Sequence, residues 1–164
     1  MSQLPSETIE FAHRMFEAAR RGDSVLLLSA VDRGLPSNLT NDKGFSAQPY
    51  IMSESHPFLL GNTLLMLAAY AGHTELAKGL LDRGGDPNRV NDLGQSIIAG
   101  AVFKAHNDIV HALIAKGADP RLGTPNAIQA AYMFGRNDLM AVLGAQEDDF
   151  KGVPTPPSLA VPDL

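Results

Sequence analysis

Apolar and polar residues follow one another in blocks along residues 62–90, which read NTLLMLAAYAGHTELAKGLLDRGGDPNRV. The pattern predicts a short helix, a tight turn, a second helix and a glycine-rich return. It recurs thirty-three residues later. The matching positions are His73 with His106, Leu81 with Ile114, Gly84 with Gly117, Asp86 with Asp119 and Pro87 with Pro120. The chain is therefore predicted to consist of a repeated pair of helices.

A self-match at this period is typical of the ankyrin repeat. The residues that carry the resemblance are Thr63, Leu67-Ala68-Ala69, Gly72-His73, Leu80-Leu81 and Gly84-Gly85-Asp86-Pro87-Asn88. Over about residues 10–145, apart from an insertion described below, the chain resembles the ankyrin-repeat family, and it looks similar to the small stand-alone ankyrin proteins of bacteria and fungi. The resemblance implies an all-α solenoid of four helix-turn-helix repeats with short β-hairpin tips. It also implies a scaffold that binds other proteins.

The first repeat lies fifty residues before the second. An amphipathic helix is expected over Ser6–Arg20 and a leucine-rich helix over Ser24–Val31. The first of these is polar, as expected of an N-terminal cap, because a terminal repeat exposes one face to water. Residues 91–122 form the third repeat. Residues 123–145 form the fourth, in which a shortened hairpin and a short second helix, Asp138–Leu143, suit a C-terminal cap.

An insertion separates the first two repeats. Asn41-Asp42-Lys43-Gly44 matches Asn91-Asp92-Leu93-Gly94 at an offset of 50 residues, which is 33 plus 17. Seventeen extra residues, Phe45–Gly61, are therefore expected as a loop that leaves the hairpin tip. Three interpretations stay open. The segment is a neutral loop, a partner-binding loop on the recognition edge, or the product of an unspliced short intron if the source is eukaryotic.

The composition changes at Gln146, so we divide the chain into a repeat domain, 1–145, and a tail, 146–164. The tail begins with an acidic run, Glu147-Asp148-Asp149, and ends in the proline-bearing KGVPTPPSLAVPDL. We expect it to be disordered or extended, because it cannot bury much apolar surface. A minimal P-x-x-P at Pro154–Pro157 and a minimal phosphorylation motif at Thr155-Pro156 both recur by chance, so a plain solvated tail is the alternative.

Local signals support the repeat alignment. One equivalent position, immediately before each second helix, is predicted to supply a capping side chain; it is held by Ser24, Thr74, Asn107 and Asn137. Glycines that follow these helices suit left-handed termini, namely Gly34, Gly84 and Gly117. The family's usual Thr-Pro-Leu-His is replaced by Thr63-Leu64-Leu65-Met66 and Ser96-Ile97-Ile98-Ala99. The histidine hydrogen bonds of that motif are therefore expected to be absent and the hairpins less rigidly tied.

The resemblance also implies a place for the partner. In ankyrin repeats the hairpin tips and first helices make the concave surface, and the two positions after Ala68-Ala69 point into it. The implied partner-binding residues are Arg20 with Arg21, Tyr70 with Ala71, Phe103 with Lys104, and Met133 with Phe134, with Lys43, Leu93 and Gln95 on the rim. Aromatic and thioether groups flanked by cations are typical of an interface hot spot. The alternative is that these side chains pack, half-buried, over neighbouring hairpins.

The composition of the chain argues against several classes of function. The formal net charge of −5 argues against binding to a nucleic-acid backbone. The chain has no cysteine, which excludes disulfides, thiolate metal ligands and thiol nucleophiles. No apolar run is long enough to span a membrane, and no signal peptide is predicted. We expect a monomer in the cytoplasm, with access to the nucleus by diffusion if the source is eukaryotic.

The five histidines do not suggest a catalytic or metal site. His73 and His106 hold the structural turn position, and His56 beside Ser55 does not make a triad. No catalytic, metal-ligating or cofactor-binding residue is predicted, and no enzyme. The sequence favours a non-catalytic protein-binding module that uses the concave groove and the hairpin tips. The alternative is a client-specific chaperone or stability factor for a single enzyme or complex.

Overall fold

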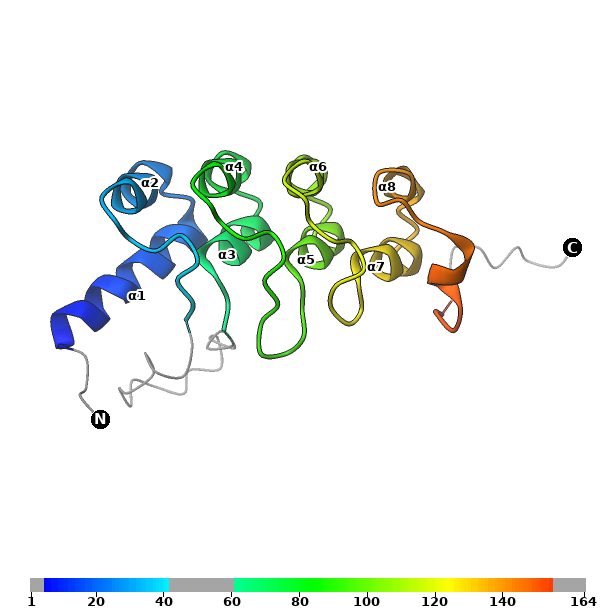
Figure 1. Cartoon of the computed structure of the whole chain (residues 1–164), viewed down its shortest axis with the longest axis horizontal. Coiled ribbons are helices and arrows are strands. Elements are labelled where there is room, and N and C mark those ends of the chain that lie inside the picture. The colour runs from blue at the N-terminus through cyan, green and yellow to red at the C-terminus, as the bar shows by residue number, and fades with distance from the viewer. Residues whose placement is uncertain (1–4, 42–60, 155–164) are drawn as a thin grey trace, which may run out of the picture.

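The computed structural model describes residues 5–41 and 61–154 as a stack of helix pairs, shown in Figure 1. Eight α-helices and one short 3-10 helix occur in this part of the chain. Their bounds are α1 Ser6–Arg21, α2 Ser24–Asp32, α3 Leu64–Ala71, α4 Thr74–Asp82, α5 Ile97–Phe103, α6 Asn107–Ala115, α7 Ala127–Met133, α8 Asn137–Met140 and η2 Glu147–Phe150. The predicted all-α solenoid of four repeats is confirmed.

The helices form two rows. The inner row contains α1, α3, α5 and α7, and the outer row contains α2, α4, α6 and α8, with hairpin tips projecting beyond the inner row (Figure 1). Each inner helix packs against the next inner helix and against the outer helix of its own repeat. The tips contain isolated antiparallel bridges, Thr40 with Thr63 and Val90 with Ser96, rather than strands. The expected β-hairpins are therefore reduced to single bridges in the described residues.

The core lies between the two rows and between successive repeats. One outer-row position shows how stacking creates it. Leu76, Ile109 and Leu139 hold this position in the later repeats and are at most 1% exposed, whereas Leu26 holds it in the first repeat and is 37% exposed. The same residue type is buried only where a preceding repeat covers it, so burial depends on the neighbour.

The helix caps differ from the sequence prediction. Ser24, Thr74, Asn107 and Asn137 are the first residues inside the outer helices, not their caps. Asp23 caps α2 instead, while His73, His106 and Arg136 precede the later outer helices without a side-chain cap bond. Side-chain caps occur on the inner helices, where Thr63, Ser96 and Asn126 each accept a bond from an amide in the first turn. The prediction was one residue late. In the three later repeats the residue before the outer helix bonds to the preceding repeat instead of capping its own helix.

Two histidines join successive repeats through the left-handed glycine of the preceding inner helix. His73 Nε2 lies 2.7 Å from the Arg20 carbonyl oxygen, and its ring fills the space where a side chain on Gly22 would stand. His106 repeats the arrangement, with Nε2 at 3.2 Å from the Tyr70 carbonyl oxygen. A carbonyl can only accept, so each Nε2 donates. Histidine bonds between repeats are therefore present, at a position other than the one considered from the sequence.

The hairpin tips are joined by amide side chains. The Asn62 backbone amide donates to Asn41 Oδ1 at 2.7 Å, and Asn91 Nδ2 donates to Asn62 Oδ1 at 3.0 Å. Asn91 Oδ1 accepts from the backbone amides of Leu93 and Gln95. All three asparagines are buried, so these bonds satisfy groups that water cannot reach. The expectation of less rigidly tied hairpins overlooked these amide contacts.

Part of the expected tail belongs to the folded structure. Residues 146–154 continue past Ala145 into η2, where the Phe150 ring stacks on Tyr132 with centroids 4.7 Å apart. Arg121 donates to both oxygens of Asp149, at 3.1 and 2.8 Å. An aromatic side chain and an ion pair thus hold a segment whose composition suggested disorder. Residues 155–164, and the insertion except for Gly61, lie outside the described residues.

Candidate partner-binding groove

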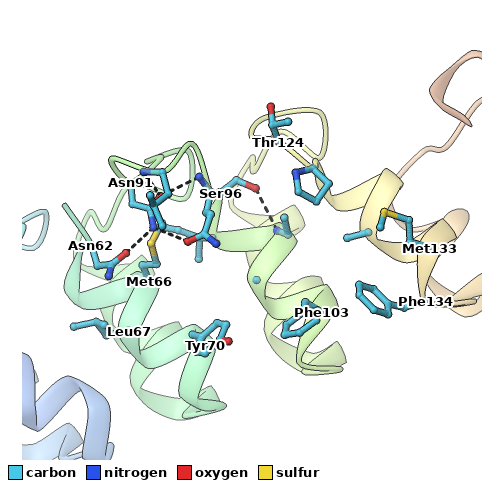
Figure 2. A pocket seen from close by; sticks show the side chains of 17 residues that line it. Asn62, Met66, Leu67, Tyr70, Asn91, Ser96, Phe103, Thr124, Met133 and Phe134 are labelled. Carbon is cyan, nitrogen blue, oxygen red and sulfur yellow. Dashed lines mark hydrogen bonds between the residues drawn. The ribbon is translucent and has the colours of Figure 1, made fainter. Parts of the chain in front are cut away.

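A hollow of about 530 Å³ opens between the hairpin tips and the inner helices of the second, third and fourth repeats. Figure 2 shows its lining, which draws on α3, α5, α7 and the connecting tips. The lining residues are Asn62, Met66, Leu67, Tyr70, Asn91, Leu93, Gln95, Ser96, Ile97, Ala99, Gly100, Phe103, Thr124, Pro125, Ala130, Met133 and Phe134. They are mostly apolar, and none is ionisable except through the Tyr70 phenol. We call this hollow the inner groove.

Small residues make the floor of the inner groove deep. Leu67, Gly100 and Ala130 occupy one repeat position on α3, α5 and α7. Gly100 has no side chain and Ala130 has only a methyl group, whereas the second repeat has the larger Leu67 at this position. A Cβ on Gly100 would lie 3.4 Å from Tyr70 Cδ2, so the absence of a side chain there lets the Tyr70 ring lie beside the helix.

Aromatic rings stand along the groove, roughly one for each repeat. Tyr70, Phe103 and Phe134 are 40%, 52% and 51% exposed. Phe103 and Phe134 meet edge to face, with centroids 5.1 Å apart (Figure 2). This contact stabilises both rings while leaving half of each in water. Exposed rings held in fixed positions are suited to a contact surface, because little side-chain entropy remains to be lost on binding.

The two edges of the inner groove differ in charge. At the helix edge, Lys104 Nζ lies 5.0 Å from the Tyr70 ring centroid, a cation–π contact. Within residues 5–41 and 61–154, Lys104 has no carboxylate partner. At the tip edge, Asp92 approaches Gly61, and Leu93 beside it is 58% exposed. Gln95 accepts a bond from Asn91 at the same edge.

The structure brings most of the predicted site residues together. Tyr70, Phe103, Met133, Phe134, Leu93 and Gln95 line the inner groove, and Lys104 stands over the Tyr70 ring. Arg20 is not part of the lining: its guanidinium pairs with Glu17, and its carbonyl oxygen accepts the bond from His73. Arg21 also approaches Glu17. Lys43 lies outside the described residues. Met133 is partly buried, and the three rings are about half exposed, so the alternative of half-buried packing stays open.

The sequence missed the floor and part of the rim. Met66 and Leu67 line the groove and are at the same time buried members of the core. Thr124 and Pro125 line it from the fourth repeat, and Thr124 lies thirty-three residues after Asn91. The repeat period of thirty-three residues could therefore have indicated Thr124 as the equivalent of Asn91. Nothing in the local pattern separates Leu67 from its fully buried neighbours.

Charged groups with a lowered pKa lie away from the inner groove. Hydrogen bonding to Arg83 lowers the pKa of Asp32, and Lys116 does the same for Asp82 at the ends of the outer helices. Arg136 lowers the pKa of Asp138 on α8. The pKa of Asp149 is lowered first by the Gln146 backbone amide and then by Arg121. In the described part of the chain, no group of three or more ligating side chains could hold a metal ion. Nor is any helix there long and apolar enough to cross a membrane.

Known proteins share the repeat pattern and the fold of this chain. The family described as “Ankyrin repeats (3 copies)” matches residues 15–124. An ankyrin repeat protein of Pseudomonas aeruginosa, PA3287, is 37% identical over 76 residues, which is 46% of this chain and 34% of that protein. The crystal structure of the human ASB11 ankyrin repeat domain superposes with a TM-score of 0.61 at 24% identity, covering 81% of this chain and 53% of that one. The chain thus spans about a third of the curated relative and half of the solved domain.

Proposed function

Because the chain belongs to the ankyrin-repeat family, whose repeats generally mediate protein–protein interaction, we propose that it binds a protein partner in the inner groove. The observation that carries this proposal is the exposure of Tyr70, Phe103 and Phe134 around an apolar hollow. Large exposed apolar patches in soluble proteins mark interaction sites.

The groove has the anatomy of a protein contact surface. Its centre is apolar and aromatic, its rim carries Gln95 and Thr124, and the cation of Lys104 stands at one edge. Aromatic anchors at the centre of a patch supply most of the binding free energy, while a polar rim excludes water. No lining residue carries a carboxylate, imidazole or amine that could act in general acid–base catalysis. These features support a role in binding rather than in catalysis.

Affinity purification from the source cell, with wild-type protein and two variants, tests the proposal. Phe103→Asp places a charge at the centre of the groove and is expected to weaken partner binding by at least about thirtyfold, as for a hot-spot residue. Val25→Asp is the matched control, because Val25 is 83% exposed on outer-row helix α2 and lies outside the groove lining. It should leave binding unchanged.

Two results would contradict the proposal. One is full partner recovery with Phe103→Asp, and the other is equal loss with both variants. Thermal melting of each variant checks that the fold survives. If the recovered partner becomes insoluble in cells that lack this protein, the interaction serves as a client-specific chaperone. If the partner stays soluble, the interaction serves as a binding module.

A further inference from the structure

The spacing of equivalent side chains on the inner row restricts the conformation of a partner segment that lies along the inner groove. Tyr70, Phe103 and Met133 hold one repeat position on α3, α5 and α7, and these helices are packed neighbours. Axes of packed helices lie about 8–10 Å apart. A polyproline II chain completes a turn of three residues in about 9.3 Å, so every third residue meets the same position of the next repeat. An α-helix repeats at about 5.4 Å, and two of its turns, at about 10.8 Å, overshoot this spacing.

The chemistry of the floor favours proline at those positions. Gly100 has no side chain, so the Tyr70 ring lies against α5, and the small Ala130 lines the groove together with the exposed Phe103 ring. A proline ring is compact and apolar and packs against an aromatic face. Proline also lacks a backbone N–H, so it brings no donor into an apolar slot where no acceptor waits. Aromatic-lined grooves take proline-rich segments in other recognition domains, where the preformed polyproline II conformation lowers the entropy lost on binding.

Two donors at the groove can serve the backbone of such a segment. Carbonyl groups of a polyproline II chain are not bonded within the chain and remain available as acceptors. The Tyr70 hydroxyl makes no hydrogen bond within the described residues. Gln95 uses Oε1 to accept from Asn91 Nδ2, which leaves its Nε2 hydrogens for another acceptor.

The charges at the two edges of the inner groove indicate which charged residue a bound segment carries beside its prolines. Lys104 stands at the helix edge without a carboxylate partner in the described residues, and Asp92 lies at the tip edge. An acidic residue of the partner is therefore attracted to the helix edge and repelled at the tip edge.

We propose that the inner groove takes a proline-rich segment of a partner protein in polyproline II conformation. The segment has prolines three residues apart and an acidic residue that pairs with Lys104. This inference rests on the proposed function and specifies the partner of the same site.

The experiment uses the full chain and fluorescein-labelled synthetic peptides, with binding followed by fluorescence anisotropy. The first probe has proline at every third position, leucine and alanine between, and one glutamate after the last proline. The second has the same composition with proline at every second position. The third carries lysine in place of the glutamate, and the fourth is a proline-free amphipathic helical peptide.

The first probe is expected to bind at least about tenfold more tightly than the second. Phe103→Asp should abolish this binding, and Tyr70→Phe, which keeps the ring and removes the hydroxyl, should weaken it by several-fold. Lys104→Glu should reverse the preference between the glutamate and lysine probes. Val25→Asp should bind as the wild type does.

Equal binding of the first two probes, or no binding of the first, would overturn the inference. Groove-dependent binding of the helical peptide in preference to the first probe would overturn it as well, while leaving the proposed function intact. The proposed function fails separately, if Phe103→Asp does not affect recovery of the native partner.

Discussion

The outer and inner rows of this solenoid use the same repeat for opposite purposes. On the outer row, the last residue of one helix pairs with the residue just after the next outer helix. Asp32 meets Arg83 at 2.7 Å, and Asp82 meets Lys116 at 2.8 Å. On the inner row, the aromatic side chains of successive repeats stay half exposed around a hollow. The outer row thus joins successive repeats through ion pairs, whereas the inner row of the later repeats leaves aromatic surface exposed around the hollow.

This difference agrees with the proposed use of the inner row for binding. The ion pairs of the outer row recur at one repeat position, which Asp32 and Asp82 hold in the first two repeats. In the third repeat Ala115 holds this position, so the series ends there. Inner-row positions do not repeat their chemistry, since Arg20, Tyr70, Phe103 and Met133 hold one place in four repeats. A position needed for stacking repeats its residue type, whereas a position that meets a partner is free to vary from repeat to repeat.

The largest effect on stability is expected at Gly72, where the inner helix α3 ends against the His106 ring of the next repeat. Gly72 has φ +84°, and a Cβ there would lie 2.6 Å from the His106 ring. Gly72→Ala should lower the free energy of unfolding by about 1–3 kcal/mol through backbone strain. Displacement of His106 should add to the loss.

Gly117→Ala is the control for Gly72→Ala. Gly117 has φ +85°, and no atom lies within 4 Å of an added Cβ. It should lose only the strain contribution. Urea denaturation measures both variants. An equal loss in the two would show that His106 contributes nothing to the stack.

A smaller effect on stability is expected in the inner groove. Phe103→Asp removes the edge-to-face contact with Phe134 at 5.1 Å, a contact worth about 0.5–1.5 kcal/mol. About half of the Phe103 side chain is already in water, so the burial lost is limited. Thermal melting should show a small shift in a variant whose binding is lost. A collapse of the fold would place Phe103 in the core and cancel the contrast between the rows.

A still smaller effect is expected from the outer-row ion pairs. Arg83→Met removes the partner of Asp32 but keeps the apolar stem, and both side chains are partly in water. The free energy of unfolding should fall by less than in Phe103→Asp, and added salt should reduce the difference from wild type. A double-mutant cycle with Asp32→Asn isolates the pair. A large, salt-independent coupling would contradict this prediction.

The smallest effect is the pH dependence of the same pair. The folded-state pKa of Asp32 is lowered by Arg83 from its ordinary value of 3.8. A lowered carboxyl pKa stabilises the fold above 3.8, and this contribution is lost as pH falls through the folded value. The difference in urea midpoint between wild type and Arg83→Met should therefore be constant at neutral pH and shrink below about 3.8. A difference that grows on acidification would contradict this account.

The fold was largely predictable because stacking imposes a period. The offsets of 33 and 50 residues aligned the helix pairs, and Gly84 and Gly117 were placed correctly at left-handed termini with φ near +85°. The site was predictable in part. Tyr70, Phe103, Met133 and Phe134 follow from the same alignment. Arg20 does too, yet its guanidinium pairs with Glu17 rather than lining the groove.

The caps and the end of the chain were harder to predict, because their partners are distant in sequence. His73 reaches back to Arg20, so the residue before α4 is used between repeats rather than as a cap. Phe150 stacks on Tyr132, and Asp149 pairs with Arg121, although the acidic, proline-bearing composition suggested a solvated tail.

The sequence by itself determined the repeat, the helix pairs and their left-handed glycine ends, because these depend on residues only a few positions apart and recur with the period. Tertiary structure alone decided the depth of the inner groove, the histidine and asparagine contacts between repeats and the folding of Gln146–Pro154. Each of these depends on how side chains from different repeats meet in space, and a linear pattern of apolar and polar residues does not specify that meeting.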